Sequence, residues 1–138
     1  MSSITRLAFV DDEIGMQQIF RIFFKKAVRE GLYEIWYFTS GEECLEFLRK
    51  DRDSQMIVLT DINMPGMDGF SLLGLIKSEF PKMQVVMVSA YSSQDIIEKA
   101  FLQGAKGYLT KPIDVQVVKD KISELKKANE NETKKGKN

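Results

Sequence analysis

Five short, largely apolar runs recur along the chain and constrain its fold more than any other feature. They are Leu7–Val10, Tyr33–Thr39, Met56–Leu59, Gln84–Ala90 and Gly107–Thr110. Apolar runs of this length are typical of strands that a sheet buries on both faces. Each run is followed by a segment with apolar residues at three- and four-residue steps, the spacing of an amphipathic helix. Because helical crossovers join parallel strands, the sequence predicts an α/β fold, a doubly wound five-stranded parallel sheet with five helices.

The first predicted helix runs from Ile14 to about Arg29, and Gly31 is placed to end it. Its spacing predicts a buried stripe made of Met16, Ile19, Phe20, Phe23 and Ala27. Three further apolar residues fall off that stripe, namely Ile14, Ile22 and Val28. We expect these three on the surface, either as ordinary exposed hydrophobes or as a patch where a partner docks.

The later helices carry start signals, and the chain ends in a polar segment. Ser40, Asp68 and one of Ser92 and Ser93 are predicted N-caps. The last helix is expected to begin near residue 113 or 114, and its apolar residues stop after residue 128. We therefore expect one folded domain over residues 1–128 and a disordered tail over residues 129–138.

Composition excludes several classes of function. The chain has no histidine, so it contains neither a Ser-His-Asp triad nor a His-ligated zinc site. Its single cysteine, Cys44, allows no internal disulfide and falls in a predicted helix as a small buried residue. Twenty basic residues balance twenty acidic ones, which gives no electrostatic reason to expect nucleic acid or a membrane as partner. Without a signal peptide or a membrane-spanning run, the expected location is cytoplasmic.

Polar side chains follow four of the five predicted strands, at the point where each strand ends. They are Asp11 and Asp12, Asp61, Ser89 and Lys111. Because the carboxyl ends of parallel strands meet at one edge of a sheet, we expect these side chains to converge. Clustered carboxylates suit a hard divalent cation such as Mg²⁺ (or Mn²⁺), and a lysine suits a phosphate oxygen. A cation, a lysine and a hydroxyl around one carboxylate are what formation of an aspartyl phosphate requires.

Four motifs together resemble the receiver domain of response regulators, the CheY-like family of two-component signalling with a flavodoxin-like fold. They are VDDE after the first strand, DINMPGMDG around the end of the third, SAY after the fourth and YLTKP after the fifth. The resemblance extends from about Arg6 to Ala128. It implies that Asp61 accepts a phosphoryl group from a histidine kinase or a histidine phosphotransfer protein. The implied Mg²⁺ ligands are Asp11, Asp12, Asp61 and the backbone carbonyl of Asn63.

The same resemblance implies a conformational switch. Ser89 and Lys111 would bind the phosphoryl oxygens, and Tyr108 matches an aromatic position whose ring turns inward as Ser89 moves. Ser89 stands where threonine is commoner in the family, which keeps the hydroxyl. Tyr91 would lie near the pocket mouth and slow attack by water. By this interpretation the chain is not an enzyme beyond its own phosphorylation and dephosphorylation, and it signals to a downstream protein or a fused output domain.

Three alternatives compete with this interpretation. An aspartyl phosphatase of the haloacid-dehalogenase kind needs acids at alternate positions after the first strand, whereas Asp11 and Asp12 are adjacent. A calcium-binding loop starting at Asp61 lacks oxygen ligands at Pro65 and Leu72. A receiver-like module that binds partners without phosphorylation remains open, as do phosphorylation-dependent dimerisation and the choice between a stand-alone protein and a segment of a longer regulator.

Overall fold

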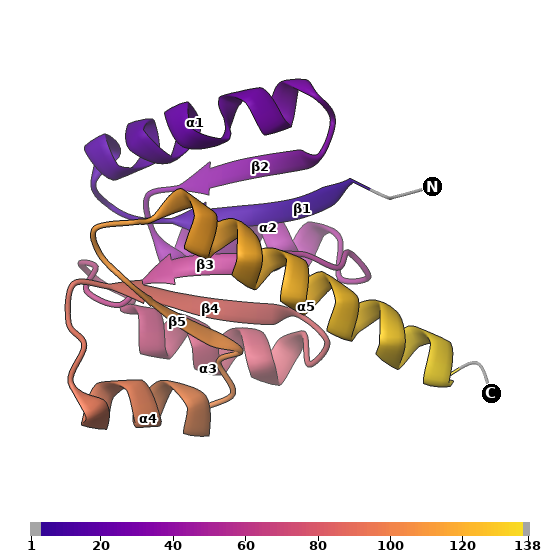
Figure 1. Cartoon of the computed structure of the whole chain (residues 1–138). Coiled ribbons are helices and arrows are strands. Elements are labelled where there is room, and N and C mark those ends of the chain that lie inside the picture. Colours follow the sequence, from indigo (N-terminus) through magenta and orange to yellow (C-terminus); the bar gives the residue numbers. More distant parts are fainter. Residues whose placement is uncertain (1–3, 137–138) are drawn as a thin grey trace.

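The computed structural model describes residues 4–136 and contains a single five-stranded sheet with five helices. The strands are β1 (Thr5–Val10), β2 (Tyr33–Phe38), β3 (Ile57–Asp61), β4 (Gln84–Ser89) and β5 (Gly107–Thr110). The helices are α1 (Ile14–Arg29), α2 (Gly41–Lys50), α3 (Gly69–Glu79), α4 (Gln94–Leu102) and α5 (Val115–Gly136). Strands and helices alternate along the chain, so the predicted fold class is confirmed (Figure 1).

All the strands of this sheet run parallel, in the order β2-β1-β3-β4-β5. The order reverses direction at β1, since the chain moves first to β2 on one side and then to β3 on the other. The carboxyl ends lie level, because Val10 pairs with Thr60 and Asp61 pairs with Val88. Such a reversal creates the crevice in which doubly wound sheets bind their ligands, at the carboxyl edge beside β1 and β3.

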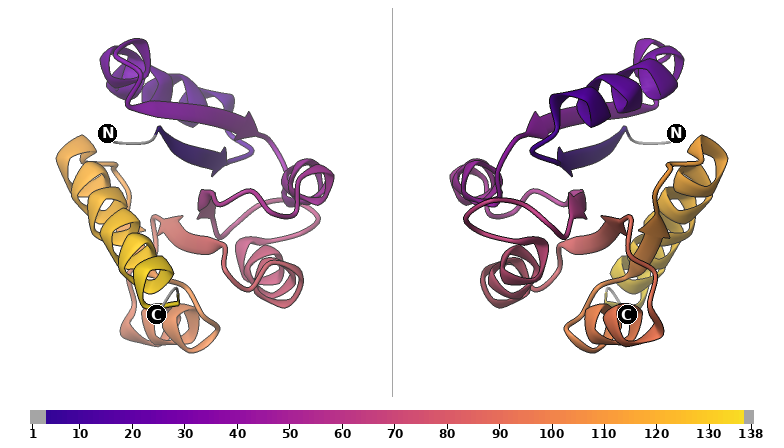
Figure 2. Two further views of the ribbon diagram at one scale, coloured as in Figure 1. Left: turned by 90° about the vertical axis from the view of Figure 1, so that its right-hand side faces the viewer. Right: turned by 90° about the vertical axis from the view of Figure 1, so that its left-hand side faces the viewer.

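Helices cover both faces of the sheet, and each face has its own apolar core. Helices α2, α3 and α4 pack on one face around Leu48, Leu73 and Ala100. Helices α1 and α5 cover the other face around Phe20, Phe24 and Ile122. The views along the strands in Figure 2 show the sheet between these two layers. The central strands are apolar along their length because helices bury them on both faces.

Strand β2 lies at an edge of the sheet and is rich in aromatic residues. Tyr37 on its α1 side contacts the rings of Phe9 and Phe20 edge-on. Trp36 on its α2 side packs against Phe47, with ring centroids 5.4 Å apart. These rings cover both faces of β2, which is an edge strand of the sheet formed by the described residues 4–136.

The predicted buried stripe of α1 is partly wrong. Phe20 and Ala27 are buried as expected, but Ile19 and Phe23 are 43% and 41% exposed. Gln17 and Phe24 are buried in their place. The buried face of α1 therefore differs from the predicted one. Phe24 is buried because the Phe20 ring stacks between Phe9 and Phe24, and Gln17 is buried because its amide hydrogen-bonds to the carbonyls of Asp11 and Phe38. The expected exposure of the three apolar residues off the stripe is confirmed, at 55% for Ile14, 70% for Ile22 and 42% for Val28.

The predicted N-caps are confirmed for three helices. Ser40 Oγ accepts a hydrogen bond from the Glu43 amide at 3.2 Å. Asp68 Oδ1 accepts one from the Ser71 amide at 2.8 Å, and Ser93 caps α4 in the same way. These caps satisfy amide groups that the first turn of a helix leaves without a partner.

Helix α5 differs from the sequence prediction. A disordered tail is expected from residue 129, yet the helix continues to Gly136. Asn129 Nδ2 donates a hydrogen bond to Gln55 Oε1 at 2.8 Å, which fastens the helix to the loop before β3. Glu and Lys, frequent after that point, favour helix, and a helix already formed extends at little cost. Residues 137–138 of the predicted tail lie outside the described residues. Within residues 4–136, no helix combines the length and the apolar character needed to cross a membrane.

Candidate functional site

The predicted side chains gather at the carboxyl edge of the sheet. Asp11 and Asp12 directly follow β1, and Asp61 and Ser89 are the last residues of β3 and β4. Lys111 is the first residue after β5. The level strand ends therefore bring together residues separated by up to 100 positions in the sequence.

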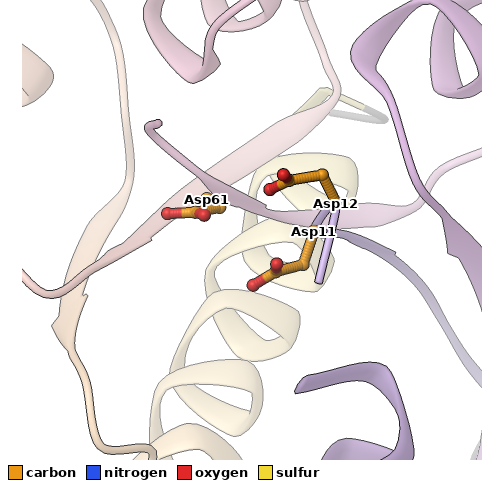
Figure 3. A group of neighbouring side chains, drawn as sticks. All are labelled: Asp11, Asp12 and Asp61. Atoms are coloured by element: carbon orange, nitrogen blue, oxygen red, sulfur yellow. The ribbon is translucent and has the colours of Figure 1, made fainter. Parts of the chain in front are cut away.

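Three carboxylates form the centre of the site (Figure 3). One oxygen from each of Asp11, Asp12 and Asp61 lies within 4.8 Å of the others. Asp11 and Asp61 are buried, with exposures of 1% and 6%, whereas Asp12 is partly exposed. Three negative charges so close together repel one another strongly, and a cation relieves this repulsion.

Lys111 supplies one such positive charge. Its Nζ lies 3.0 Å from Asp11 Oδ2 and 3.4 Å from Asp61 Oδ2. Burial lowers the pKa of Lys111, but the hydrogen bond to Asp11 and the charges of both carboxylates raise it, and the net direction is upward. The lysine therefore stays charged between the two buried acids.

Asp61 is the less well compensated of these acids. Burial raises the pKa of its carboxyl, Lys111 lowers it, the negative charge of Asp11 raises it again, and the net direction is upward. The shorter contact of Lys111 is with Asp11, so Asp61 receives the smaller share of its positive charge. The negative charge on Asp61 is accordingly disfavoured in the folded chain.

Backbone groups hold the two buried aspartates in place. Asp11 Oδ1 accepts a hydrogen bond from the Glu13 amide at 2.9 Å, and Asp61 Oδ1 accepts one from the Ile62 amide at 2.8 Å. In each aspartate the other oxygen, Oδ2, faces Lys111. The two carboxylates are thus oriented by backbone amides of residues that follow their strands.

Gln17 is a supporting residue that the sequence prediction missed. Its Nε2 donates to the backbone carbonyls of Asp11 and Phe38, both at 3.1 Å, and so ties the end of β1 to the end of β2. The signal was available in the sequence, because Gln17 shares one helical face with Phe20, Phe24 and Ala27. A polar residue on a buried face needs a partner, and here the partners are strand ends.

Ser89 is buried at the end of β4, on the other side of β3 from Asp11. Its Oγ accepts a hydrogen bond from the Tyr91 amide at 3.1 Å, and its carbonyl accepts one from the Lys111 amide at 2.8 Å. The Tyr108 hydroxyl donates to the carbonyl of Tyr91. Hydrogen bonds therefore connect all four residues predicted for the switch and the pocket mouth.

The loop between β3 and α3 follows Asp61 closely. The Gly69 amide donates to the Ile62 carbonyl at 2.8 Å, which closes the loop. A Cβ at Gly69 would lie 2.3 Å from the carbonyl oxygen of Asp61, so only glycine fits there. Asn63 lies exposed in this loop, and metal coordination by its carbonyl stays a prediction.

The donor set fits a hard divalent cation. All three clustered side chains are carboxylates, and Mg²⁺ and Mn²⁺ prefer oxygen ligands. Mg²⁺ typically takes few carboxylates and completes its shell with water and phosphate oxygens, which suits a site at an open sheet edge.

Comparison with known proteins gives one family. The sequence model of the response regulator receiver domain matches residues 7–123. The response regulator protein FleR of Pseudomonas aeruginosa is 36% identical over 106 residues, which cover 71% of this chain and 22% of FleR. Sporulation initiation phosphotransferase F of Bacillus subtilis is 29% identical over 117 residues, which cover 85% of this chain and 90% of that protein.

A solved structure agrees with these matches. The CheX–CheY–BeF₃–Mg²⁺ complex of Borrelia burgdorferi contains a chain of 26% identity that superposes with a TM-score of 0.79, covering 88% of both chains. The lengths of the curated relatives differ, and the chain spans about a fifth of FleR and of the transcriptional regulator NtrC of Proteus hauseri.

Proposed function

Because the chain belongs to the response-regulator receiver family, we propose that Asp61 accepts a phosphoryl group from a histidine kinase or a histidine phosphotransfer protein. The observation that supports this most is the shared lysine. Lys111 contacts both Asp11 and Asp61, and Asp61 remains the carboxylate whose charge the fold compensates less. A buried, oriented carboxylate beside a cation and an open edge is suited to attack on phosphorus.

The proposed step is an in-line displacement. An oxygen of Asp61 forms a bond to phosphorus while the bond from phosphorus to the donor's imidazole nitrogen breaks, and the nitrogen keeps the electron pair. Lys111 Nζ, already 3.4 Å from Asp61 Oδ2, neutralises charge on the phosphoryl oxygens. The ammonium is held there by Asp11, so it needs little rearrangement.

Ser89 supplies a second donor in this proposal. Its Oγ already accepts the Tyr91 amide, and a hydroxyl that accepts one hydrogen bond still has its own proton to donate. Movement of Ser89 toward a phosphoryl oxygen would strain the hydrogen bond from the Tyr91 amide and thereby the contact of Tyr91 with Tyr108. We propose this linkage as the switch.

We propose that Asp11, Asp12, Asp61 and the carbonyl of Asn63 hold Mg²⁺ (or Mn²⁺). The ion would supply positive charge for the oxygens of the transferred group. The carboxylate cluster supports this assignment, as does the Mg²⁺ of the similar Borrelia complex.

We propose that the surface that changes when Asp61 is phosphorylated includes α4, β5 and the start of α5. Helix α4 buries only one of its residues, Ala100, so few apolar contacts oppose its movement. The downstream partner would be a protein, whether separate or fused, and cytoplasmic location stays a prediction. We assign no activity beyond self-phosphorylation and self-dephosphorylation, and dimerisation on phosphorylation remains open.

Intact mass spectrometry after incubation with a small acyl phosphate tests the proposal. Wild type with Mg²⁺ should gain one phosphoryl group, and wild type with EDTA or Asp61→Asn should not. Asp53→Asn is the matched control, because Asp53 is exposed in the loop before β3. Acceptance by Asp61→Asn at the normal rate would refute the assignment. If no variant forms an adduct, phosphate release distinguishes fast hydrolysis from a module that binds without phosphorylation.

A further inference from the structure

Gln17 is a buried amide on a face of α1 that is otherwise apolar. Its side chain is 7% exposed, and the other buried residues of the helix are Phe20, Phe24 and Ala27. Burying an amide costs free energy unless hydrogen bonds compensate it, whereas a methionine of similar length would fill the space without that cost. The contribution of Gln17 therefore lies in the groups that its amide holds.

Those groups lie at the carboxyl ends of β1 and β2. The Asp11 amide donates to the Phe38 carbonyl at 3.0 Å, beyond the last paired residues of the two strands. In a longer parallel ladder the amide of residue 40 would donate to the Asp11 carbonyl, but Ser40 is the N-cap of α2. Gln17 Nε2 supplies a donor to the Asp11 carbonyl instead, at 3.1 Å. The same nitrogen donates to the Phe38 carbonyl at 3.1 Å, so it joins both strand ends.

The Asp11 carbonyl belongs to the peptide group that joins Asp11 to Asp12. Because a peptide group is planar, fixing this carbonyl also fixes the direction in which the chain enters Asp12. Both side chains belong to the carboxylate cluster, in which one oxygen of each acid lies within 4.8 Å of the others (Figure 3). The donor from Gln17 therefore acts on the backbone that carries two of the three clustered carboxylates.

We propose that Gln17 is a positioning residue for the Mg²⁺ (or Mn²⁺) that Asp11 and Asp12 are proposed to hold, an inference that rests on the proposed function. Gln17 acts through the peptide group between these two acids, which its Nε2 holds. Without this donor the peptide group turns more freely, and an ion must order it on binding. Groups that orient metal ligands from outside typically change metal affinity about 10–100-fold when they are replaced.

Electron paramagnetic resonance of Mn²⁺ during titration with the full chain tests the proposal, because the signal of the free ion falls as the protein binds it. Gln17→Met keeps the length of the side chain and removes the donor, so the Kd for Mn²⁺ should rise about tenfold. Gln17→Asn keeps an amide on a side chain one carbon shorter, which draws the donor away from the Asp11 carbonyl, and its Kd should rise as well. Should Gln17→Met fail to fold, Gln17→Asn carries the test.

Phe24→Leu separates positioning from stability. Phe24 is buried on the same face of α1 and stacks on Phe20, so this variant should be less stable in urea and yet bind Mn²⁺ as wild type does. Unchanged affinity in the Gln17 variants, or an equal loss in Phe24→Leu, would overturn the proposal.

Asp12→Asn distinguishes failure of this inference from failure of the proposed metal site. If Asp12→Asn weakens Mn²⁺ binding and the Gln17 variants do not, the carboxylates hold the ion and only the role of Gln17 is wrong. If Asp12→Asn binds Mn²⁺ as wild type does, the metal site and the role of Gln17 are both wrong.

Discussion

Replacing Asp61 by asparagine should stabilise the metal-free protein. The substitution removes one of three crowded negative charges and changes the side-chain shape little. Asparagine keeps an oxygen that can accept the hydrogen bond from the Ile62 amide. Lys111 keeps its closer partner, Asp11, at 3.0 Å. The variant therefore loses one attraction and relieves two repulsions.

The magnitude follows from the distances. With an effective dielectric constant of about 20, the Lys111–Asp61 contact at 3.4 Å gives roughly 5 kcal/mol of attraction. Charges 4.8 Å apart, the upper limit for Asp61 with Asp11 and with Asp12, repel by about 3.5 kcal/mol each. Repulsion exceeds attraction by about 2 kcal/mol. Because Asp12 is partly exposed and solvent screens it, we expect a gain of about 1–2 kcal/mol.

The assay is urea unfolding followed by far-ultraviolet circular dichroism at pH 7, in EDTA and low salt. A higher midpoint with unchanged slope would show greater stability. Asp53→Asn again serves as control, because its exposed carboxylate should change the free energy of unfolding by less than about 0.5 kcal/mol. If Asp61→Asn is less stable than wild type in EDTA, the attraction to Lys111 dominates and the reasoning is wrong.

The pH dependence of stability independently tests whether Asp61→Asn stabilises the protein. The pKa of Asp61 is raised in the folded chain, so the unfolded chain releases this proton at lower pH. The ionised Asp61 lowers the stability of the folded protein by its full amount at a pH above the pKa in the folded chain. It has no effect on stability at a pH below the unfolded pKa of about 3.9, where the carboxyl is protonated in both states. The advantage of Asp61→Asn should therefore fade as the pH falls toward about 4. Added Mg²⁺ should also reduce it, because an ion that binds the folded wild type stabilises that protein.

Four other positions give further predictions of stability and reactivity. Gly69→Ala should lower the free energy of unfolding by about 2–4 kcal/mol in the same urea assay, since its Cβ would meet a backbone oxygen at 2.3 Å. Gly74→Ala, with nothing within 4 Å, should raise it by about 0.5–1 kcal/mol. Burial raises the pKa of the Cys44 thiol to about 12, so a thiol reagent at pH 8 should react only as the chain unfolds. Tyr108→Phe removes the donor to the Tyr91 carbonyl and should cost about 1 kcal/mol, with faster amide exchange around residue 91.

The fold was predictable because its signals are local and repeated. Each central strand is apolar on both faces, and caps such as Ser40 and Asp68 mark where helices begin. Which face of α1 is buried was not predictable from hydrophobicity alone. Phe23 and Phe24 are equally apolar neighbours, and Phe24 is the one that is buried because its ring stacks on Phe20, which in turn stacks on Phe9 of β1.

The convergence of the site residues was predictable from topology, since strand ends meet at one edge. The sharing of Lys111 between Asp11 and Asp61 was not, because it depends on distances of a few ångströms. Nor could the sequence show that Ser89 Oγ is engaged by the Tyr91 amide. Such contacts depend on loop conformation, which short-range sequence patterns specify weakly.

The position of Trp36 determines how this protein can be observed. The chain has one tryptophan, and it lies on edge strand β2, two strands away from β3 and Asp61. It packs on Phe47, and the Arg6 guanidinium lies 5.5 Å from the centre of its ring. Its fluorescence should therefore report unfolding of the β2–α2 edge while remaining silent when ions or phosphoryl groups bind. An optical titration of the site needs a second indole placed beside it, for example Tyr91→Trp.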